Sequence, residues 1–291
     1  MKGIILAGGM GTRLYPITLA VSKQLLPVYD KPMIYYPLSM LMLAGIREIM
    51  LISTPRDLPL FRHLLGSGSQ WGLQFTFAEQ AEPRGLPEAF IIAEKYLDGG
   101  PACLILGDSI FFGQGISAQL MGAARLQEGG IIFAYRVRNP QRYGVVEFDN
   151  AGRAINMEEK PVSPRSNFAI PGLYFFDGRV SSLARKLSPS PRRELEITDL
   201  ARLYLEMGQL QVLPMGRGIA WLDAGTPESL LQAANFIQAV QERQGIMISS
   251  PEEIAYRRGF ISKEMLIKLA QSYNKNDYAG YLLRLAEEKI S

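Results

Sequence analysis

Residues 3–14 read GIILAGGMGTRL, and this stretch decides the class of fold. The apolar run 4–7 predicts a buried strand, and the glycines that follow it predict a tight loop whose backbone N–H groups can approach a phosphate. The glycines have neither the dinucleotide spacing G-x-G-x-x-G nor the P-loop pattern. Taken alone, Gly8 and Gly9 are equally compatible with an ordinary turn. The loop therefore indicates a phosphate site only if other residues support it.

The first half of the chain repeats this alternation of apolar runs and helical segments. Strands are predicted at 4–7, 48–54, 75–79 and 103–107, and crossover helices at 33–44 and 87–96. Strands that are hydrophobic almost throughout are typical of a sheet covered on both faces. The pattern predicts an α/β fold with a mostly parallel, Rossmann-like sheet flanked by helices.

From residue 131 the apolar pieces become shorter and richer in β-forming residues. Strands are predicted at 131–137, 144–148, 173–176 and 211–215, with a turn at 149–152. Between the last two strands, apolar residues from Leu200 to Met207 have helical spacing, with Thr198 as the expected cap and Gly208 as the stop. We expect this half to form a β-rich lid over the sheet.

The chain becomes helical after about residue 226. Thr226 and Pro227 are expected to open one helix, and a capping box at 250–253 is expected to open another. Near the end, an apolar stripe could pack on the same chain or on a second subunit; it consists of Tyr278, Tyr281, Leu282 and Leu285. We expect a core over 1–225, divided near residue 130, and a C-terminal helical region over 226–291.

Composition excludes several classes of protein. The 291 residues carry 31 basic and 28 acidic side chains, a net charge of +3 without the basic block that a nucleic-acid partner would require. The apolar segment 33–44 falls short of the roughly 20 residues needed to span a membrane. Cys103 is the only cysteine, which rules out a disulfide or a cysteine-rich zinc site. The amino terminus does not resemble a secretory signal, so we expect a cytoplasmic protein.

Several motifs along the chain resemble those of the sugar-phosphate nucleotidyltransferases. They are LAGGMGTRL at 6–14, SKQLLPV at 22–28, YDKPMIYYPL at 29–38, RYGVVEF at 142–148, EEKP at 158–161, ELEITD at 194–199 and AWLD at 220–223. The stretch 29–38 is similar to the thymidylyltransferase branch in particular. Because the motifs occur in the family's order, the resemblance covers essentially the whole chain and implies a nucleotide half, about 1–130, and a sugar-binding lid, about 131–225.

Charged residues in these motifs suit phosphate and metal chemistry. Arg13 and Lys23 could hold a leaving pyrophosphate. Asp108 follows the predicted strand 103–107, at the sheet edge where α/β folds bind ligands, and carboxylates are ligands that Mg²⁺ prefers. Alone, Asp108 and Asp223 could each be a cap or turn residue; the resemblance implies that both hold Mg²⁺. A sugar phosphate can attack the nucleotide directly, and we interpret His63, the only histidine, as an ordinary helix residue.

The resemblance also implies the remaining site residues. Those expected to act in catalysis are Arg13, Lys23, Asp108, Lys160 and Asp223. Those expected to bind the nucleotide are Leu6, Gly8, Gly9, Gly11, Thr12, Arg13, Gln24, Gln80, Gly85 and Leu86. Those expected around the sugar phosphate are Ser109, Tyr143, Gly144, Glu159, Lys160, Ile170, Gly172, Arg192 and Trp221. A glutamine amide can pair with a pyrimidine's imide edge, and Glu159 can accept hydrogen bonds from sugar hydroxyls.

Some positions depart from the family pattern. The base-reading stretch 80–88 reads QAEPRGLPE, with more charge than the family usually has there. Ser109 replaces an asparagine, Pro171 a threonine and Arg193 a glycine, all near the expected sugar pocket. The stretch 112–117 lacks the usual tyrosine and histidine of a second, inhibitory site between subunits. These differences put in question which base and which sugar the site prefers and whether the end product inhibits it. They affect the expected reaction itself less.

The activity that the resemblance implies is the Mg²⁺-dependent transfer of a thymidylyl group from dTTP to glucose 1-phosphate. It would give dTDP-glucose and pyrophosphate for deoxysugars such as dTDP-rhamnose and for surface polysaccharide, in a homotetramer inhibited by the end product. One alternative is the same chemistry with UTP or another sugar phosphate. A second is a regulator that binds sugar nucleotides without turnover. A nicotinamide-dependent oxidoreductase lacks the required glycine spacing.

Overall fold

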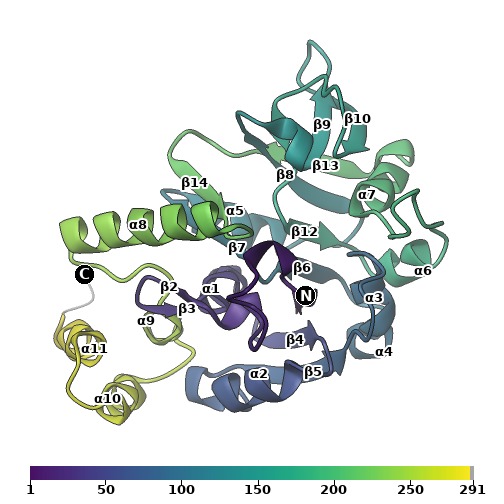
Figure 1. The fold of residues 1–291 in the computed structure, drawn as a ribbon. Coiled ribbons are helices and arrows are strands. Elements are labelled where there is room, and N and C mark those ends of the chain that lie inside the picture. Colours follow the sequence, from purple (N-terminus) through teal and green to yellow (C-terminus); the bar gives the residue numbers. More distant parts are fainter. Residues whose placement is uncertain (289–291) are drawn as a thin grey trace.

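A ten-stranded mixed sheet forms the centre of the molecule in the computed structural model, which describes residues 1–288 (Figure 1). Its strands lie in the order β10-β9-β11-β8-β12-β6-β1-β4-β5, and β13 pairs with β8. Two short two-stranded sheets stand beside it: β14 (Ile219–Asp223) pairs with β7 (Ser109–Gly113), and β2 (Pro27–Val28) pairs with β3 (Lys31–Pro32). The expected α/β class with flanking helices is confirmed.

The parallel part of the sheet lies in the first half of the chain. Its strands are β1 (Lys2–Ala7), β4 (Glu48–Ser53), β5 (Gln74–Glu79) and β6 (Ala102–Leu106). β1 pairs with β4 and β6 in parallel, and β4 pairs with β5 in parallel. All four predicted strands are confirmed to within two residues at each end. The helices of this half are α1 (Tyr35–Leu43), α2 (Leu58–Leu65), α3 (Glu88–Ile92), α4 (Glu94–Leu97) and α5 (Ile116–Ala123).

The second half continues the same sheet, chiefly with antiparallel pairs. β12 (Leu173–Phe176) lies antiparallel between β6 and β8 (Gly130–Arg136). Beyond β8 lie β9 (Gly144–Phe148), β10 (Ala154–Glu159) and β11 (Phe168–Ala169), which form the upper part of Figure 1. β13 (Leu210–Pro214), α6 (Val180–Ala184) and α7 (Ile197–Glu206) complete this half. The sheet is therefore parallel in the amino-terminal half and mixed beyond it.

The start of α7 differs from the prediction. Thr198 lies inside the first turn, and Glu196 occupies the cap position without a side-chain cap. The methyl group of Thr198 is packed toward Gly144, where an added Cβ would be 2.7 Å from Thr198 Cγ2. Thr198 thus packs against Gly144 from within the first turn instead of capping the helix. Gly208, with φ 68°, follows the helix end as expected.

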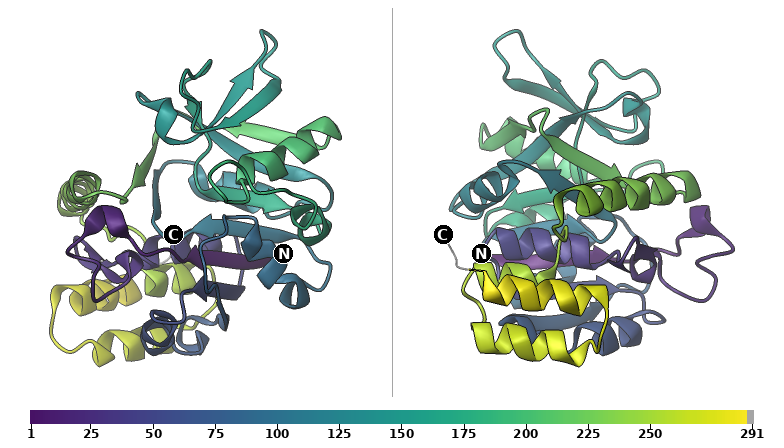
Figure 2. Two further views of the ribbon diagram at one scale, coloured as in Figure 1. Left: turned by 45° about the vertical axis from the view of Figure 1, so that its right-hand side comes forward. Right: turned by 90° about the vertical axis from the view of Figure 1, so that its left-hand side faces the viewer.

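The C-terminal helices pack mainly on the amino-terminal half of the chain. They are α8 (Pro227–Gln244), α9 (Pro251–Arg257), α10 (Lys263–Ser272) and α11 (Asp277–Glu287). Figure 2 shows α10 and α11, in yellow, beside the purple and blue elements of the amino-terminal half. Tyr281, Leu282 and Leu285 share one buried core with Ile5. The apolar stripe of α11 is thus covered by its own chain.

The helix starts follow the prediction at α8 and only partly at α9. Thr226 and Ser229 form a reciprocal capping box on α8. At α9, Ser250 accepts a hydrogen bond from the Glu253 backbone N–H, but the Glu253 carboxylate does not return it. That carboxylate instead accepts from Arg257 Nε at 2.8 Å and from Tyr281 O–H at 2.7 Å.

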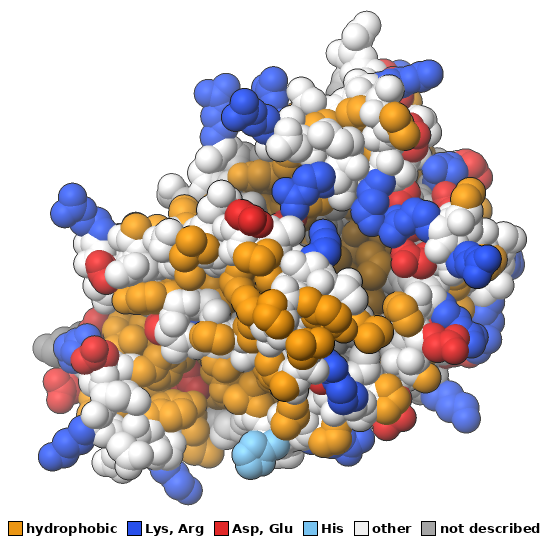
Figure 3. All heavy atoms as spheres, in the orientation of Figure 1, with side chains coloured by type: hydrophobic (Ala, Val, Ile, Leu, Met, Phe, Trp, Pro, Cys, Tyr) orange, Lys and Arg blue, Asp and Glu red, His pale blue; other side chains and the backbone are white. Residues whose placement is uncertain are grey.

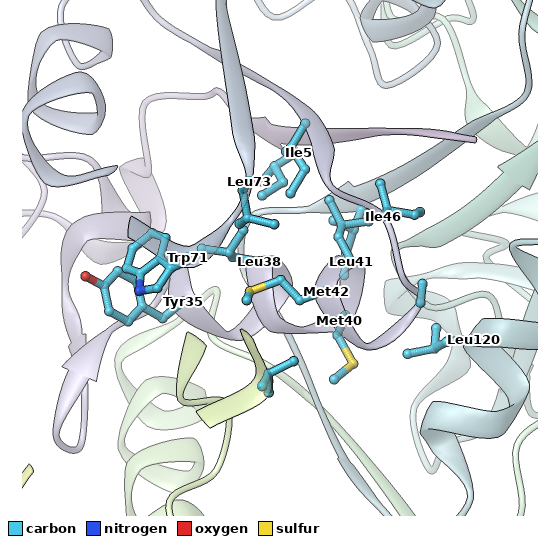
Figure 4. Packing of buried hydrophobic residues seen from close by; sticks show 14 of the residues in the cluster. Ile5, Tyr35, Leu38, Met40, Leu41, Met42, Ile46, Trp71, Leu73 and Leu120 are labelled. Atoms are coloured by element: carbon cyan, nitrogen blue, oxygen red, sulfur yellow. The ribbon is translucent and has the colours of Figure 1, made fainter. Parts of the chain in front are cut away.

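The helix predicted at 33–44 is α1, and it is buried from Tyr35 to Met42. Figure 4 shows its side chains packed with Ile5, Leu73 and Trp71. The rings of Tyr35 and Trp71 meet edge to face with centroids 5.6 Å apart. Within residues 1–288, no helix combines the length and the apolar character that crossing a membrane requires.

A buried carboxylate joins the C-terminal helices to this core. Glu252 is fully buried, and its carboxylate accepts hydrogen bonds from Trp71 Nε1 at 3.0 Å, Tyr273 O–H at 2.7 Å, Tyr278 O–H at 2.6 Å and Ser250 O–H at 3.2 Å. No lysine or arginine of the described chain forms an ion pair with it. Neutral donors alone therefore satisfy this carboxyl group, and their hydrogen bonds tie α9, α10 and α11 to the segment before β5.

Candidate active site

A cavity of about 550 Å³ lies between the carboxyl ends of the parallel strands and the lid. Figure 3 shows basic side chains gathered around this recess. All predicted site residues line it except Gly11 and Thr12. The predicted residues that line it are Leu6, Gly8, Gly9, Arg13, Lys23, Gln24, Gln80, Gly85, Leu86, Asp108, Ser109, Tyr143, Gly144, Glu159, Lys160, Ile170, Gly172, Arg192, Trp221 and Asp223.

The glycine-rich loop after β1 presents Arg13 to the cavity. Gly9 and Gly11 have φ of 89° and 62°, a conformation that glycine adopts without strain. The buried Thr18 hydroxyl donates to the Gly11 carbonyl at 2.8 Å and closes the loop behind the cavity. Gly11 and Thr12 thus shape the loop without lining the cavity. Arg13 reaches Gly225, where an added Cβ would lie 3.1 Å from Arg13 Nη2.

Asp108 forms an ion pair with Lys23 on the floor of the cavity. Only 15% of the Lys23 side chain and 18% of the Asp108 side chain are exposed. Burial acts to raise the pKa of Asp108, but the charges of Lys23 and Arg13 outweigh burial and hold this pKa below its ordinary value. Asp108 is therefore ionised at neutral pH and available to a cation.

Asp223 is the last residue of β14 (Ile219–Asp223), and two residues of the lid donate hydrogen bonds to its carboxylate. Its Oδ2 accepts a hydrogen bond from Tyr143 O–H at 2.7 Å and another from Arg142 Nη2 at 3.2 Å. Burial and the nearby Asp223 raise the pKa of Tyr143 to about 12, so its phenol stays protonated and donates. The Tyr143 ring also packs on Trp221, with centroids 5.0 Å apart.

The two aspartates suit a hard divalent cation. Asp223 is the register partner of Ser109 in β7 (Ser109–Gly113), and Asp108 directly precedes Ser109. The two aspartates therefore lie near the ends of two paired strands, and both line the cavity. Among residues 1–288, no group of three or more histidine, cysteine, aspartate or glutamate side chains could hold a metal. This donor set fits Mg²⁺, which commonly takes one or two carboxylates and completes its shell with phosphate oxygens and water.

The lid side of the cavity carries a network of carboxylates and cations. Glu159 Oε1 lies 3.6 Å from both Lys160 Nζ and Arg192 Nη1, and Arg192 Nη1 lies 3.4 Å from Glu196 Oε1. Burial raises the pKa of Glu159, and Lys160 opposes this shift. Lys160 has φ 44°, an uncommon backbone conformation for a residue with a side chain. Such conformations concentrate at functional sites.

Ser109 and Gly172 approach closely in the wall between the sheet and the lid. A Cβ added to Gly172 would lie 2.7 Å from Ser109 Oγ and 2.5 Å from Leu106 Cγ. Ser109 is 4% exposed. The serine found in place of the expected asparagine therefore belongs to a tightly packed part of the cavity wall, where residue 172 has no room for a side chain.

The stretch 80–88 closes the opposite wall. Gly85 forms an isolated parallel bridge with Leu195 and has φ 105°. A Cβ at Gly85 would lie 2.1 Å from the Leu195 carbonyl oxygen, so only glycine fits. Gln80 is 6% exposed, and its Nε2 donates to Glu88 Oε2 at 2.7 Å. The Ser22 hydroxyl donates to Gln24 Oε1 at 2.5 Å.

Arg193, which replaces the expected glycine, has φ 62° and lies in the left-handed region. We expect Arg193→Gly to stabilise the protein by about 1 kcal/mol, because a side chain in this conformation costs of order 1–3 kcal/mol and glycine's larger freedom in the unfolded chain offsets part of the gain. Thermal unfolding should then shift upward by roughly 2 °C.

Asp98→Gly is a suitable comparison, because Asp98 also has a positive φ, of 52°, yet aspartate tolerates this region better than arginine. Its gain should be smaller than that of Arg193→Gly. An unchanged or lower unfolding temperature for Arg193→Gly would contradict the proposed strain.

The cavity also contains residues that the sequence analysis did not single out. They are Pro83, Leu106, Arg142, Tyr174, Glu194, Leu195, Glu196, Ile197 and Gly225. Arg142 and Glu194–Ile197 belong to motifs already quoted, so their position in those motifs was an available signal. Leu106 and Tyr174 lie on central strands, where burial in the core is the simpler interpretation of an apolar or aromatic side chain.

The sequence profile of the nucleotidyl transferase family matches residues 2–240. This chain belongs to that family. Members described as glucose-1-phosphate thymidylyltransferase align with it over nearly their whole length. The protein of Xanthomonas campestris pv. campestris (strain B100) is 57% identical over 98% of this chain and 97% of its own. Those of Neisseria meningitidis serogroup A and Mycobacterium tuberculosis (strain CDC 1551 / Oshkosh) are 56% and 53% identical, over 99% of this chain and 100% and 99% of their own.

Solved structures agree with this family assignment. A Bacillus anthracis protein crystallised with sucrose is 39% identical, with a TM-score of 0.75 over 81% of this chain and 94% of its own. A UDP-glucose pyrophosphorylase crystallised with UDP-glucose is 23% identical, with a TM-score of 0.72 over 84% of this chain and 99% of its own. The second likeness concerns the fold alone.

Proposed function

We propose that the protein transfers a thymidylyl group from dTTP to α-D-glucose 1-phosphate and releases pyrophosphate. The observation that carries this proposal is that Asp108 and Asp223 line one cavity near the ends of paired strands, between a glycine-rich loop and a lid that carries Lys160 and Arg192. The names of the relatives that are 50–57% identical support the choice of substrates.

In the proposed reaction, a phosphate oxygen of glucose 1-phosphate attacks the α-phosphorus of dTTP. A new phosphorus–oxygen bond forms as the bond to the β-phosphate bridging oxygen breaks, and pyrophosphate leaves. The attacking oxygen is already anionic, so no side chain has to act as nucleophile. Arg13 and Lys23 line the loop side of the cavity and would offset the charge of the leaving pyrophosphate. Lys160 and Arg192 line the lid side and would hold the sugar phosphate.

Asp108 and Asp223 would hold Mg²⁺ in this proposal. When bound, the ion would supply positive charge to phosphate oxygens and help to orient them. Lys23 and Arg142 pair with these carboxylates and line the same cavity. Both cations are therefore placed where they could also contact phosphate groups of the substrates.

The proposal extends to the biological setting in several respects. We infer a cytoplasmic enzyme that supplies dTDP-glucose for deoxysugars, such as dTDP-rhamnose, and for surface polysaccharide. We also infer a homotetramer with end-product inhibition, in which the C-terminal helical region and residues 112–117 would contribute to contacts between subunits. We propose that residues 1–130 form the nucleotide half, residues 131–225 the sugar-binding lid and residues 226–291 the C-terminal helical region.

A substrate panel tests this function. Pyrophosphate release is measured with dTTP, UTP and other triphosphates, each combined with glucose 1-phosphate or another sugar 1-phosphate and Mg²⁺. The highest kcat/KM is expected for dTTP with glucose 1-phosphate. A preference for UTP or another sugar would replace the substrate assignment, whereas tight nucleotide binding without release from any pair would favour the regulatory alternative.

A further inference from the structure

The contact between Gln80 and Glu88 bears on which base the site accepts. Gln80 lines the cavity, whereas Glu88 stands behind it as the first residue of α3. Gln80 Nε2 donates to Glu88 Oε2 at 2.7 Å and lies 3.5 Å from the Gly85 carbonyl oxygen. Both neighbours of this nitrogen are acceptors.

A carboxylate fixes the orientation of an amide that it contacts. An ionised glutamate has no hydrogen to donate, so only the nitrogen end of the Gln80 amide can face Glu88. The amide oxygen must then point the other way. It lies on the side of the phosphate loop, where a Cβ added to Gly8 would be 2.8 Å from Gln80 Oε1.

The rest of Gln80 leaves little freedom for another arrangement. Its backbone N–H donates to the Ser53 carbonyl at 2.8 Å, and the residue is 6% exposed. Rotating the amide by 180° would exchange two groups of nearly equal size. Packing alone therefore cannot prevent that rotation, but the resulting contact between Glu88 and the amide oxygen would bring two acceptors together without a proton.

The orientation determines which pyrimidine edge Gln80 can match. Thymine and uracil present an N3–H donor, which suits an amide whose nitrogen is held by Glu88 and Gly85 and whose oxygen remains to accept. Cytosine presents an N3 acceptor beside an amino group, and it requires the rotated amide. The two pyrimidine classes have similar size, so hydrogen bonding is the main basis for telling them apart.

We propose that Glu88 is a positioning residue that locks the Gln80 amide in the orientation that accepts thymine or uracil and rejects cytosine. This inference rests on the proposed nucleotide site but not on turnover. A glutamine in place of Glu88 could either donate or accept. Glu88 thus makes the selection stricter here than a glutamine would.

The test compares dTTP with dCTP in wild-type protein and in Glu88→Gln. The ratio of kcat/KM for the two nucleotides is measured with glucose 1-phosphate, and the ratio of their dissociation constants is measured by calorimetry without sugar. Glu88→Gln should lower both ratios by about tenfold, because either orientation of Gln80 then finds a partner. The gain should come mainly from dCTP, with kcat/KM for dTTP changed by less than about threefold.

Two further variants separate this effect from loss of charge and from loss of fold. Glu82→Gln removes a carboxylate from the same stretch, but Glu82 is exposed and pairs with Arg84; it should leave both ratios unchanged. In a Gln80→Ala background, Glu88→Gln should no longer alter the ratios, since Glu88 acts through Gln80.

Three outcomes would overturn the inference. The Glu88→Gln variant could keep the wild-type ratios of dTTP to dCTP, or Glu82→Gln could change these ratios as much as Glu88→Gln does. Glu88→Gln could also still change the ratios in the Gln80→Ala background. If the wild-type protein turns over neither nucleotide, the proposed function fails, and the calorimetric ratio alone then decides whether Glu88 orients Gln80.

Discussion

Asp223→Asn is expected to slow pyrophosphate release by about 10³-fold, because it removes one of the two charges proposed to hold Mg²⁺ against the phosphates. The asparagine oxygen can still accept the hydrogen bond from Tyr143, and Arg142 is 42% exposed and can turn to water. Thermal stability should therefore change little. Pyrophosphate release at saturating substrates and a melting curve give the two readouts.

The Asp108→Asn variant should release pyrophosphate as slowly as the Asp223→Asn variant does. It should also be less stable than the wild type. Its partner Lys23 is 15% exposed and would lose its counter-charge, which we expect to cost about 2–3 kcal/mol. Raising the Mg²⁺ concentration should restore some activity to both variants if weakened metal binding is the cause. Near-wild-type release from either variant would contradict the assignment of these aspartates.

Glu252→Ala is expected to destabilise the protein by about 4 kcal/mol. The substitution leaves Trp71 Nε1 and the hydroxyls of Tyr273 and Tyr278 without their acceptor in a buried site, and each such donor costs about 1–3 kcal/mol. The unfolding temperature should fall by roughly 10 °C. Calorimetric melting of the purified variant measures this directly.

The neighbouring Glu253 provides the matched control. Its carboxylate is 15% exposed and accepts hydrogen bonds from Tyr281 and from the half-exposed Arg257, so Glu253→Ala should cost only about 1 kcal/mol. Tyr273→Phe should have a similarly small effect, because it removes one donor and leaves the carboxylate in place. Equal losses for Glu252→Ala and Glu253→Ala would contradict a central role for Glu252.

The fold was predictable where local pattern and burial agree. The parallel strands were found because each is an apolar run ended by glycine, proline or a polar residue, and α1 was found because its segment is apolar on all sides. The antiparallel insertion of β12 between β6 and β8 left no local signal, since pairing partners far apart in sequence are chosen by tertiary packing. The position of Thr198 inside α7 also left no local signal, since its methyl group packs against Gly144, far away in the sequence.

The candidate site was predictable mainly through motifs. Gly8, Asp108 and Asp223 occur at strand ends, where α/β sheets bind ligands, and the resemblance selected them. Sequence could not indicate that Tyr143 and Arg142 hold Asp223, because these residues are about 80 positions apart and meet only through the lid. Nor could it indicate the left-handed conformation of Lys160, which depends on the surrounding structure.

Leu282 and Leu285 pack into the same core as Ile5, and this affects how the chain folds during its synthesis on the ribosome. At roughly 5–20 residues per second, synthesis of 291 residues takes about 15–60 s. Throughout that time the first strands emerge without the helices that cover them. We therefore expect the amino-terminal half to complete its core only after α11 has been synthesised, and to expose part of its apolar surface until then.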